Sequence, residues 1–140
     1  MRLVLDTNIL VSALISAAGP PGQLLAAVRD RRVTLVTSAE QLAELRDVLG
    51  RERLRRYIRK SDADALLATI DTIAKVVGDL PEIALSPDPK DNPILATAVA
   101  GEAEFLVSGD KIDLLALGSV HGIEIVTAVF ALKRLAERPD

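Results

Sequence analysis

The sequence predicts an α/β fold in which a central parallel sheet of about four to five strands lies between two layers of helices. Two observations lead to this prediction: short apolar runs alternate with helical patterns, and the runs are apolar enough to be buried on both faces. The chain has 140 residues, of which 49% are hydrophobic, so it can bury a sizeable core. We therefore expect one three-layer α/β/α domain over residues 1–140.

Five short segments are predicted to be strands because each is rich in aliphatic residues or Phe and ends near a turn-forming residue. In chain order they are residues 3–5, 33–36, 76–77, 105–107 and 123–126. Residues 17–22 and 78–90 are rich in Gly or Pro and are expected to be irregular. Because the strands alternate with helices, they are expected to pair in parallel.

The segments between the strands are predicted to be helices because their apolar residues recur every three or four positions. In chain order they are residues 9–16, 23–31, 39–49, 51–60, 62–76, 94–101, 112–117 and 128–137. Ser38 and Gln41 have capping-box spacing before the third helix, and Ser61 is the expected cap of the fifth. Pro93 suits the first turn of the sixth, where its missing N–H costs nothing.

The composition excludes several classes of site. The chain has no cysteine, which removes disulfides, thiolate zinc sites and cysteine nucleophiles. Its three aromatic residues, Tyr57, Phe105 and Phe130, are too few for base recognition of the kind that RRM or OB modules use. The single histidine, His121, precedes Gly122 in an expected turn, so imidazole catalysis is not predicted.

The net charge of −3 conceals a strongly basic run. Seven of the 17 basic residues lie close together: Arg46, Arg51, Arg53, Arg55, Arg56, Arg59 and Lys60. On an acidic protein, such a run either forms an electrostatic surface for a polyanion or is a solvated helix face. We call residues 51–60 the basic segment.

The sequence favours a cytoplasmic protein without membrane contact. No apolar stretch reaches the roughly 18 residues that a transmembrane helix requires. The first residues have the pattern of a strand and lack the charged and apolar regions of a leader peptide.

Several acids are expected at the carboxyl edge of the sheet, where open α/β folds keep functional residues. Asp6 follows the first strand directly, Asp110 follows the fourth, and Asp91 precedes the helix before the fourth. Glu44 lies on the helix after the second strand, and Glu40 lies one turn earlier. Taken singly, each acid could be only a helix cap, a turn residue or a solvated position.

Taken together, these acids indicate a cation site. Like charges a few ångströms apart raise one another's pKa, so such a cluster is tolerable when a cation compensates it. Without cysteine or a suitable histidine, the ligands are all oxygen atoms, which favours Mg²⁺ or Mn²⁺ over Zn²⁺. Ions bound in this way hydrolyse phosphodiesters by in-line attack of water. Asp113, three residues after Asp110, is a further candidate.

Four motifs follow one another along nearly the whole chain. They are Val4-Leu-Asp-Thr-Asn8, Thr37-Ser38 with Glu44-Leu45, Asp88-Pro-Lys-Asp-Asn92 before Ile94-Leu-Ala-Thr-Ala98, and Leu106-Val-Ser-Gly-Asp-Lys111. In order and spacing they resemble the PIN-domain ribonucleases, and most of all the VapC-like toxins of toxin–antitoxin pairs. Ser108 stands where many relatives have threonine, and it keeps the hydroxyl group.

The resemblance implies a metal-dependent RNA endonuclease with one or two Mg²⁺ or Mn²⁺ ions. Its catalytic and metal-binding acids would be Asp6, Glu44, Asp91 and Asp110. Asp113 would be an accessory acid, and Thr7, Asn8 and Ser108 would orient ligands or water molecules. Asp88 competes with Asp91, which is preferred because it lies three residues before Ile94, as the family pattern has it.

The resemblance also implies partners: an RNA substrate, a cognate antitoxin protein and a second copy of the chain in a homodimer. The basic residues Arg51, Arg53, Arg55, Arg56, Arg59 and Lys60 would either guide the RNA backbone or dock an acidic part of the antitoxin.

Two other classes stay open. A phosphoryl-transfer or receiver-like module also gathers acids and Mg²⁺ at a sheet edge, although a dehalogenase-type phosphatase would have a second Asp where this chain has Asn8. Labelling by acetyl phosphate or beryllofluoride would favour this class. A non-catalytic binding protein with the PIN fold is the other, and it would be favoured if a titration detected no metal binding.

Overall fold

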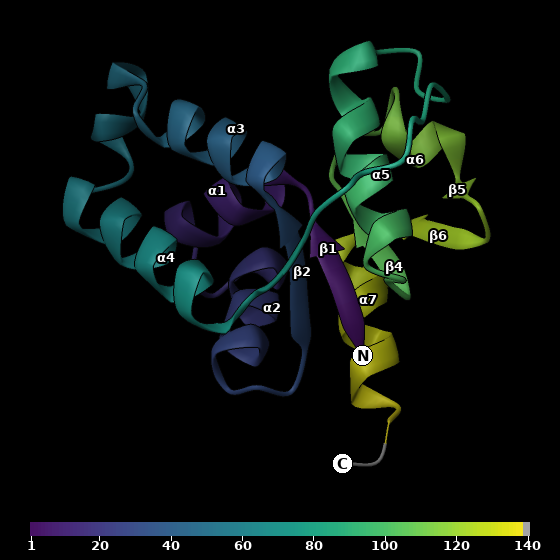
Figure 1. The fold of residues 1–140 in the computed structure, drawn as a ribbon. Helices are drawn as coiled ribbons and strands as arrows, with labels where there is room; N and C mark the ends of the chain where they lie inside the picture. The colour runs from purple at the N-terminus through teal and green to yellow at the C-terminus, as the bar shows by residue number, and fades with distance from the viewer. Residues whose placement is uncertain (139–140) are drawn as a thin grey trace.

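The computed structural model describes residues 1–138, and a six-stranded sheet forms its centre (Figure 1). The strands are β1 (Arg2–Leu5), β2 (Thr34–Ser38), β3 (Lys75–Val77), β4 (Phe105–Val107), β5 (Ser119–Val120) and β6 (Ile123–Val126). Their order is β3-β2-β1-β4-β6-β5, and all neighbours are parallel except β5 and β6. The predicted α/β class and mainly parallel sheet are confirmed; residues 139–140 of the expected domain lie outside the described part.

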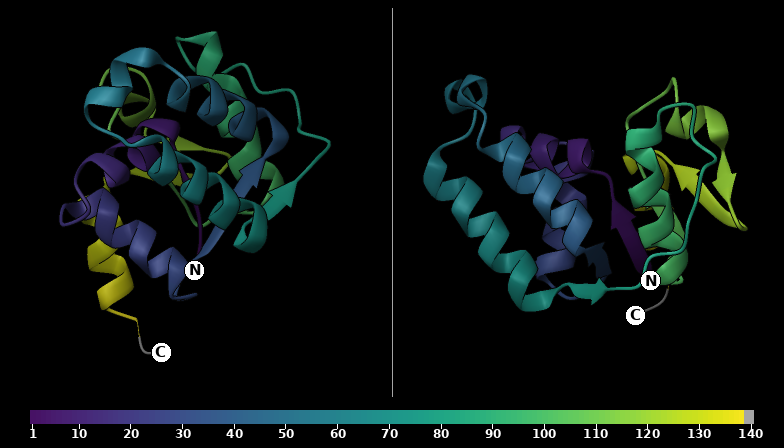
Figure 2. Two further views of the ribbon diagram at one scale, coloured as in Figure 1. Left: turned by 90° about the vertical axis from the view of Figure 1, so that its left-hand side faces the viewer. Right: turned by 45° about the horizontal axis from the view of Figure 1, so that its top comes forward.

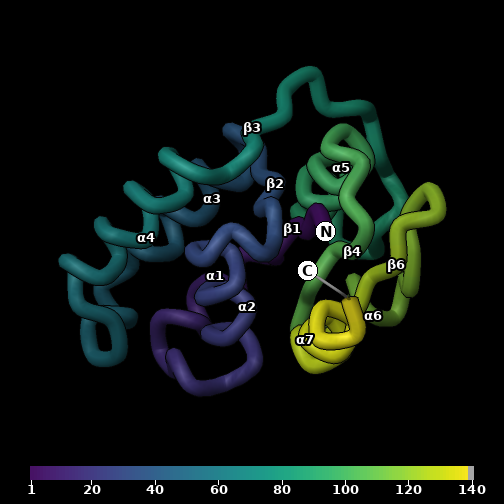
Figure 3. Tube along the Cα trace, turned by 90° about the horizontal axis from the view of Figure 1, so that it is seen from below, coloured from purple at the N-terminus to yellow at the C-terminus, as the bar shows by residue number. Residues whose placement is uncertain are grey.

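Helices cover both faces of the sheet (Figure 2). They are α1 (Thr7–Ile15), α2 (Pro20–Arg29), α3 (Ala39–Leu49), α4 (Lys60–Ile73), α5 (Asn92–Ala100), α6 (Leu114–Leu117) and α7 (Ala128–Ala136), with 3₁₀ turns η1 (Glu52–Arg56) and η2 (Pro89–Asp91). Seen along the strands in Figure 3, α1 to α4 lie on one side of β1 and α5 lies on the other. In the part of the chain described, no single helix is long and apolar enough to cross a membrane. Helices α1 and α2 reach that length and composition only when taken together, and the chain bends by 98° between them.

Strand β1 shows why the sheet is buried on both faces. Leu3 and Leu5 pack into the larger apolar cluster with α1, α2, α3, α4 and α7, whereas Val4 packs into a second cluster with α5 and α6. All three side chains are fully buried. Since successive residues of a strand point to opposite faces, an uninterrupted apolar run is what a strand between two helical layers requires.

The antiparallel edge strand β5 was not predicted. Ser119 and Val120 pair with Glu124 and Ile123 of β6 through a tight turn at residues 121–122. Both turn residues have positive φ, 46° at His121 and 82° at Gly122, as two-residue hairpin turns require. The expected turn at His121 is confirmed, but a two-residue strand is too short to leave a periodic pattern in the sequence.

The basic segment is not the helix that we expected. It forms η1 and then a turn at Tyr57 and Ile58, and α4 begins at Lys60 with Arg59 as its N-cap residue. Ser61 therefore lies inside α4 and does not cap it. The physical reason is that η1 contains one apolar residue, the half-buried Leu54, and so has no stripe that could hold a longer helix on the core.

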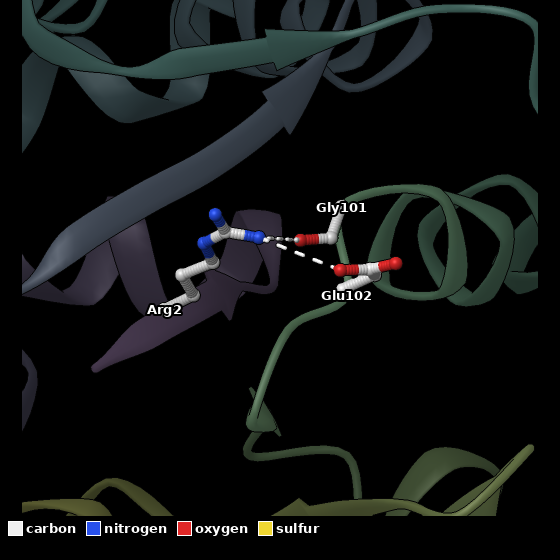
Figure 4. Close-up of polar contacts among 3 residues, drawn as sticks. All are labelled: Arg2, Gly101 and Glu102. Carbon is white, nitrogen blue, oxygen red and sulfur yellow. Dashed lines mark hydrogen bonds and ion pairs between the residues drawn. The ribbon is translucent and has the colours of Figure 1, made fainter.

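The amino ends of the strands carry paired charges (Figure 4). The Arg2 guanidinium donates to the carbonyl of Gly101 at 3.4 Å and lies 3.8 Å from the Glu102 carboxylate. Arg138, after α7, forms an ion pair with Glu104, which precedes β4. At this end of the sheet, acids and bases therefore compensate one another.

Candidate metal centre

Asp6 is both a helix cap and a buried acid at the carboxyl end of β1. One carboxylate oxygen accepts a hydrogen bond from the Thr7 N–H at 2.8 Å, and the other accepts one from the Ser108 hydroxyl at 2.9 Å. Burial raises the pKa of Asp6, these two hydrogen bonds oppose the rise, and the charges of Glu44 and Asp110 add to it. The Asp6 carboxylate therefore caps α1 and is at the same time a candidate metal ligand.

Asp110 is held beside Asp6 by a turn that follows β4. The buried Ser108 hydroxyl donates to Asp6 and accepts from the Asp110 N–H at 3.0 Å. An Asp110 carboxylate oxygen accepts in turn from the N–H groups of Ile112 and Asp113, each at 3.1 Å. One serine thus connects two acids from different loops, and Asp110 fixes the path of the chain toward Asp113.

Asp91 is the last residue of η2 and the N-cap residue of α5, but its carboxylate does not act as a cap. Within residues 1–138, its side chain makes no capping hydrogen bond to α5, and its neighbour is the Ser86 hydroxyl at 3.5 Å. Burial, and then the charges of Asp6, Asp88, Asp110 and Asp113, raise the pKa of Asp91 to about 6. A carboxyl group surrounded by four others would gain from a bound cation.

Asp88 and Asp113 join Asp91 in the tightest group of acids. Ligand atoms of Asp88, Asp91 and Asp113 all lie within 4.8 Å of one another. Oxygen atoms bound to one Mg²⁺ at opposite sites lie about 4 Å apart, so this spacing is close to that of a shared ion. From the sequence, Asp88 was an alternative to Asp91 as a metal ligand and Asp113 was an accessory acid. In the structure both lie beside Asp91.

Glu44 reaches the same edge from α3. Its side chain is exposed, and its charge contributes to the raised pKa of Asp6. Glu40, one turn earlier, lines a separate apolar hollow with Pro81 and Ile83. Of the expected orienting residues, Asn8 is exposed, whereas Thr7 is buried and its hydroxyl has no partner within residues 1–138.

A buried polar network that the sequence analysis missed lies directly beneath these acids. The Gln41 amide donates to the carbonyl of Leu5, the residue before Asp6, and accepts from the Thr37 hydroxyl at 2.8 Å. The Gln41 N–H donates to the capping Ser38 hydroxyl at 3.2 Å, but the Gln41 side chain does not complete the capping box. It instead ties α3 to the end of β1.

The network continues to α5. The Ser38 hydroxyl and the Thr97 hydroxyl are 2.8 Å apart, and Thr97 also donates to the carbonyl of Pro93 at 2.7 Å. The ends of β1 and β2, the start of α3 and the start of α5 are thus joined by hydrogen bonds. Asp6 directly follows β1, Glu44 lies on α3 and Asp91 directly precedes α5, so three of these four elements position the acids.

The acids as a whole form an uncompensated negative site. Among residues 1–138, none of Asp6, Glu44, Asp88, Asp91, Asp110 and Asp113 forms an ion pair within 4 Å. The ligand atoms are carboxylate oxygens from several loops, which suits a hard divalent cation. Chemically, such an arrangement can hold an ion against a phosphate group and activate water.

The basic segment lies apart from the acids. It follows the end of α3, whereas Glu44 lies in the middle of α3 and Asp6 follows β1. Arg51 and Arg59 pair with Asp47 and Asp62 at 3.3 and 3.4 Å. Its role in binding stays a prediction.

Comparison with known proteins gives one family. The model of the PIN domain family matches residues 2–112. An uncharacterized protein of Methanocaldococcus jannaschii is 26% identical over 118 residues, which are 84% of this chain and 75% of that protein.

Three solved structures share the fold at 17% identity. PAE2754 from Pyrobaculum aerophilum has a TM-score of 0.62 and covers 98% of this chain and 90% of its own. VapBC2 from Rickettsia felis, bound to a DNA fragment from its promoter, has a TM-score of 0.59, and FitAcB from Neisseria gonorrhoeae has 0.57. Each of these two covers 91% of this chain and 98% of its own.

Proposed function

The chain belongs to the PIN domain family, and on this premise we propose that it is a metal-dependent endoribonuclease that hydrolyses RNA phosphodiester bonds. PIN domains are generally nucleases. The observation that carries the proposal is the convergence of acids without a compensating base, among residues 1–138, at the carboxyl edge of the sheet. A protein keeps such repulsion at one site when a bound cation relieves it.

The residues fit Mg²⁺ or Mn²⁺. All the donors are carboxylate oxygens, and the ligand atoms of Asp88, Asp91 and Asp113 are close enough to share one ion. We propose Asp6, Asp91 and Asp110 as the principal ligands, with Glu44 completing the site directly or through water. Asp88 and Asp113 extend the group around Asp91, which leaves room for one ion or two.

The chain's own residues prepare the site for hydrolysis. Ser108 bonds the Asp6 carboxylate and the Asp110 N–H, and the N–H groups of Ile112 and Asp113 bond the Asp110 carboxylate, so both acids are held in place before a substrate arrives. Thr7 and Asn8 stand beside Asp6 and could order water at the scissile phosphate. When bound, the metal would lower the pKa of water and offset the charge that grows on the leaving oxygen.

We propose further that the protein is the toxin of a type II toxin–antitoxin pair. Support comes from the resemblance to VapC-like toxins and from the similar fold of the VapBC2 and FitAcB complexes. The expected partners are a cognate antitoxin and a second copy of the chain, and the expected location is the cytoplasm, where RNA is available. Co-expression with the product of the adjacent gene, followed by co-purification and light scattering, tests both partners.

The nuclease proposal is tested by Asp6→Asn. The variant keeps a side chain that can cap α1 but loses the charge, so the fold should persist while manganese-dependent cleavage of single-stranded RNA is abolished. The matched control is Asp64→Asn, because Asp64 is an exposed acid on α4 outside the site. Circular dichroism and RNA gel assays measure the fold and the activity.

Three results would contradict the proposal. Cleavage by Asp6→Asn at the rate of the parent would remove Asp6 from the reaction. Labelling of the parent by acetyl phosphate that hydroxylamine removes, without RNA cleavage, would replace the nuclease with a phosphoryl-transfer module. If the parent bound metal but cleaved no RNA under any condition, a non-catalytic binding protein would be the better description.

A further inference from the structure

The basic segment is a strongly cationic surface that the acidic site does not explain. Between residues 51 and 60 it holds six basic side chains and one acid, Glu52, in a protein whose net charge is −3. Among residues 1–138, the exposed side chains of Arg53, Arg55, Arg56 and Lys60 have no acidic partner within 4 Å. Their charges are therefore available to a ligand.

The backbone holds these charges in place. The Leu54 carbonyl accepts from the N–H groups of Tyr57 at 3.0 Å and Ile58 at 2.8 Å, which closes the turn. Ile58 is 2% exposed and belongs to the main core, and Leu54 packs against the same core. A turn anchored at both ends presents its side chains with less loss of backbone entropy than a free loop would.

One aromatic ring stands among the cations. Tyr57 is 62% exposed and lies between Arg56 and the buried Ile58 in sequence. Exposed tyrosine beside arginine can stack on the flat face of an unpaired base, a contact that the carboxylate of an acidic side chain does not offer. The sequence contains too few aromatic residues for a module built on stacking, but one ring is enough to hold one base.

We propose that the segment around η1 is a docking surface for single-stranded RNA, with Arg53, Arg55 and Arg56 on phosphates and Tyr57 stacked on a base. This inference rests on the proposed function in taking RNA as the polyanion. Glu44 lies five residues before the end of α3, about 8 Å along the helix axis. The surface therefore contacts nucleotides beyond the scissile bond and contributes to substrate binding, while the acids perform the hydrolysis.

The test compares two triple variants and two single variants. Arg53→Gln/Arg55→Gln/Arg56→Gln removes the cations, and its control, Arg29→Gln/Arg32→Gln/Arg134→Gln, removes three exposed arginines elsewhere. Tyr57→Ala removes the ring, and Tyr57→Phe keeps it. Binding of a short fluorescein-labelled single-stranded RNA is measured by anisotropy in EDTA, and kcat and KM are measured separately with Mn²⁺.

The triple variant should bind RNA more weakly, and the slope of log affinity against log salt should fall by about 2, as expected when three phosphate contacts are lost from a single strand. Tyr57→Ala should weaken binding roughly tenfold, and Tyr57→Phe should restore it. Both losses should be seen in KM and leave kcat unchanged. The control triple variant should match the parent.

Equal RNA binding by the parent and the triple variant, in a parent that cleaves RNA, would overturn the docking surface and leave the nuclease intact. If RNA binding depended on the basic segment but the parent cleaved no RNA, the docking surface would stand and the nuclease proposal would be overturned. If polyglutamate competed as well as RNA and Tyr57→Ala had no effect, the surface would be a general anion site for an acidic protein partner, and the RNA proposal would be wrong.

Discussion

The two ends of the sheet differ in charge compensation: acids are paired with bases at one end and lie among other acids at the other. At the amino ends of the strands, Arg2 lies beside Glu102 and Arg138 pairs with Glu104. At the carboxyl ends, burial and then the charges of neighbouring acids raise the pKa of Asp6 and Asp91, and Asp110 contributes to both increases. The ion pairs at the amino ends join neighbouring parts of the fold, whereas the like charges at the carboxyl ends lower its stability. The comparison supports our proposal that the carboxyl end of the sheet binds a cation.

The largest expected difference between the two ends is in activity. Asp110→Asn removes a proposed metal ligand and should lower RNA cleavage by about 10³-fold, since a bound ion contributes several kcal/mol to the transition state. Glu102→Gln, at the amino end, should leave cleavage unchanged. Steady-state rates with Mn²⁺ measure both, and equal losses in the two variants would show that the two ends do not differ in function.

An intermediate effect is expected from the network beneath the acids. Gln41→Leu leaves the Thr37 hydroxyl and the Leu5 carbonyl without their partner, which should cost about 1–3 kcal/mol of unfolding free energy. Because Gln41 ties α3 to β1, the variant should also bind Mn²⁺ more weakly in its folded state. Gln23→Leu, at an exposed glutamine, is the control for chemical denaturation and metal titration. A loss of stability with unchanged metal affinity would limit Gln41 to a structural role.

The smallest effect is expected in the pH dependence of stability. The pKa of Asp91 is raised to about 6 from about 3.8, so between these values the folded state binds more protons than the unfolded state. The stability contributed by this group is therefore lost as the pH rises through that window in the metal-free protein. Asp91→Asn does not titrate, so its stability relative to the parent should increase over the same range.

Denaturant unfolding in EDTA at several pH values between about 4 and 7 measures this difference. Because Asp91 is only partly buried, solvent screens the repulsion from the neighbouring acids, and the expected change in unfolding free energy is small. A difference that is constant with pH would mean that the neighbouring acids do not repel Asp91 in the folded protein.

Regular elements with strong local signals could be predicted from the sequence. Helix α3 has the predicted bounds because Ser38 caps it and its leucines recur at helical spacing. Strand β1 and the position of Asp6 at its end follow from one apolar run that stops at a carboxylate. Where tertiary contacts decide, as in η1 and β5, the sequence carries too few apolar residues to show the outcome.

The site could be predicted in part for the same reason. Asp6 and Asp110 follow strands, so topology alone brings them to one edge. The choice between Asp88 and Asp91 depends on the path of an irregular loop, which two hydrogen bonds of Ser86 hold. The Ser86 hydroxyl accepts from the Asp88 N–H at 3.3 Å, and the Ser86 N–H donates to the Asn92 side-chain oxygen at 3.1 Å. Gln41 was predicted only as part of a capping box, because its long-range bond to Leu5 has no local signature.

The central claim is that the carboxyl end of the sheet binds a divalent cation. The most direct measurement is a calorimetric titration of MnCl₂ into the metal-free protein at neutral pH. We predict saturable binding of one or two ions, with protons released as the raised pKa of Asp91 falls on binding. A titration without saturable heat, in a protein whose circular dichroism shows it to be folded, would contradict the claim.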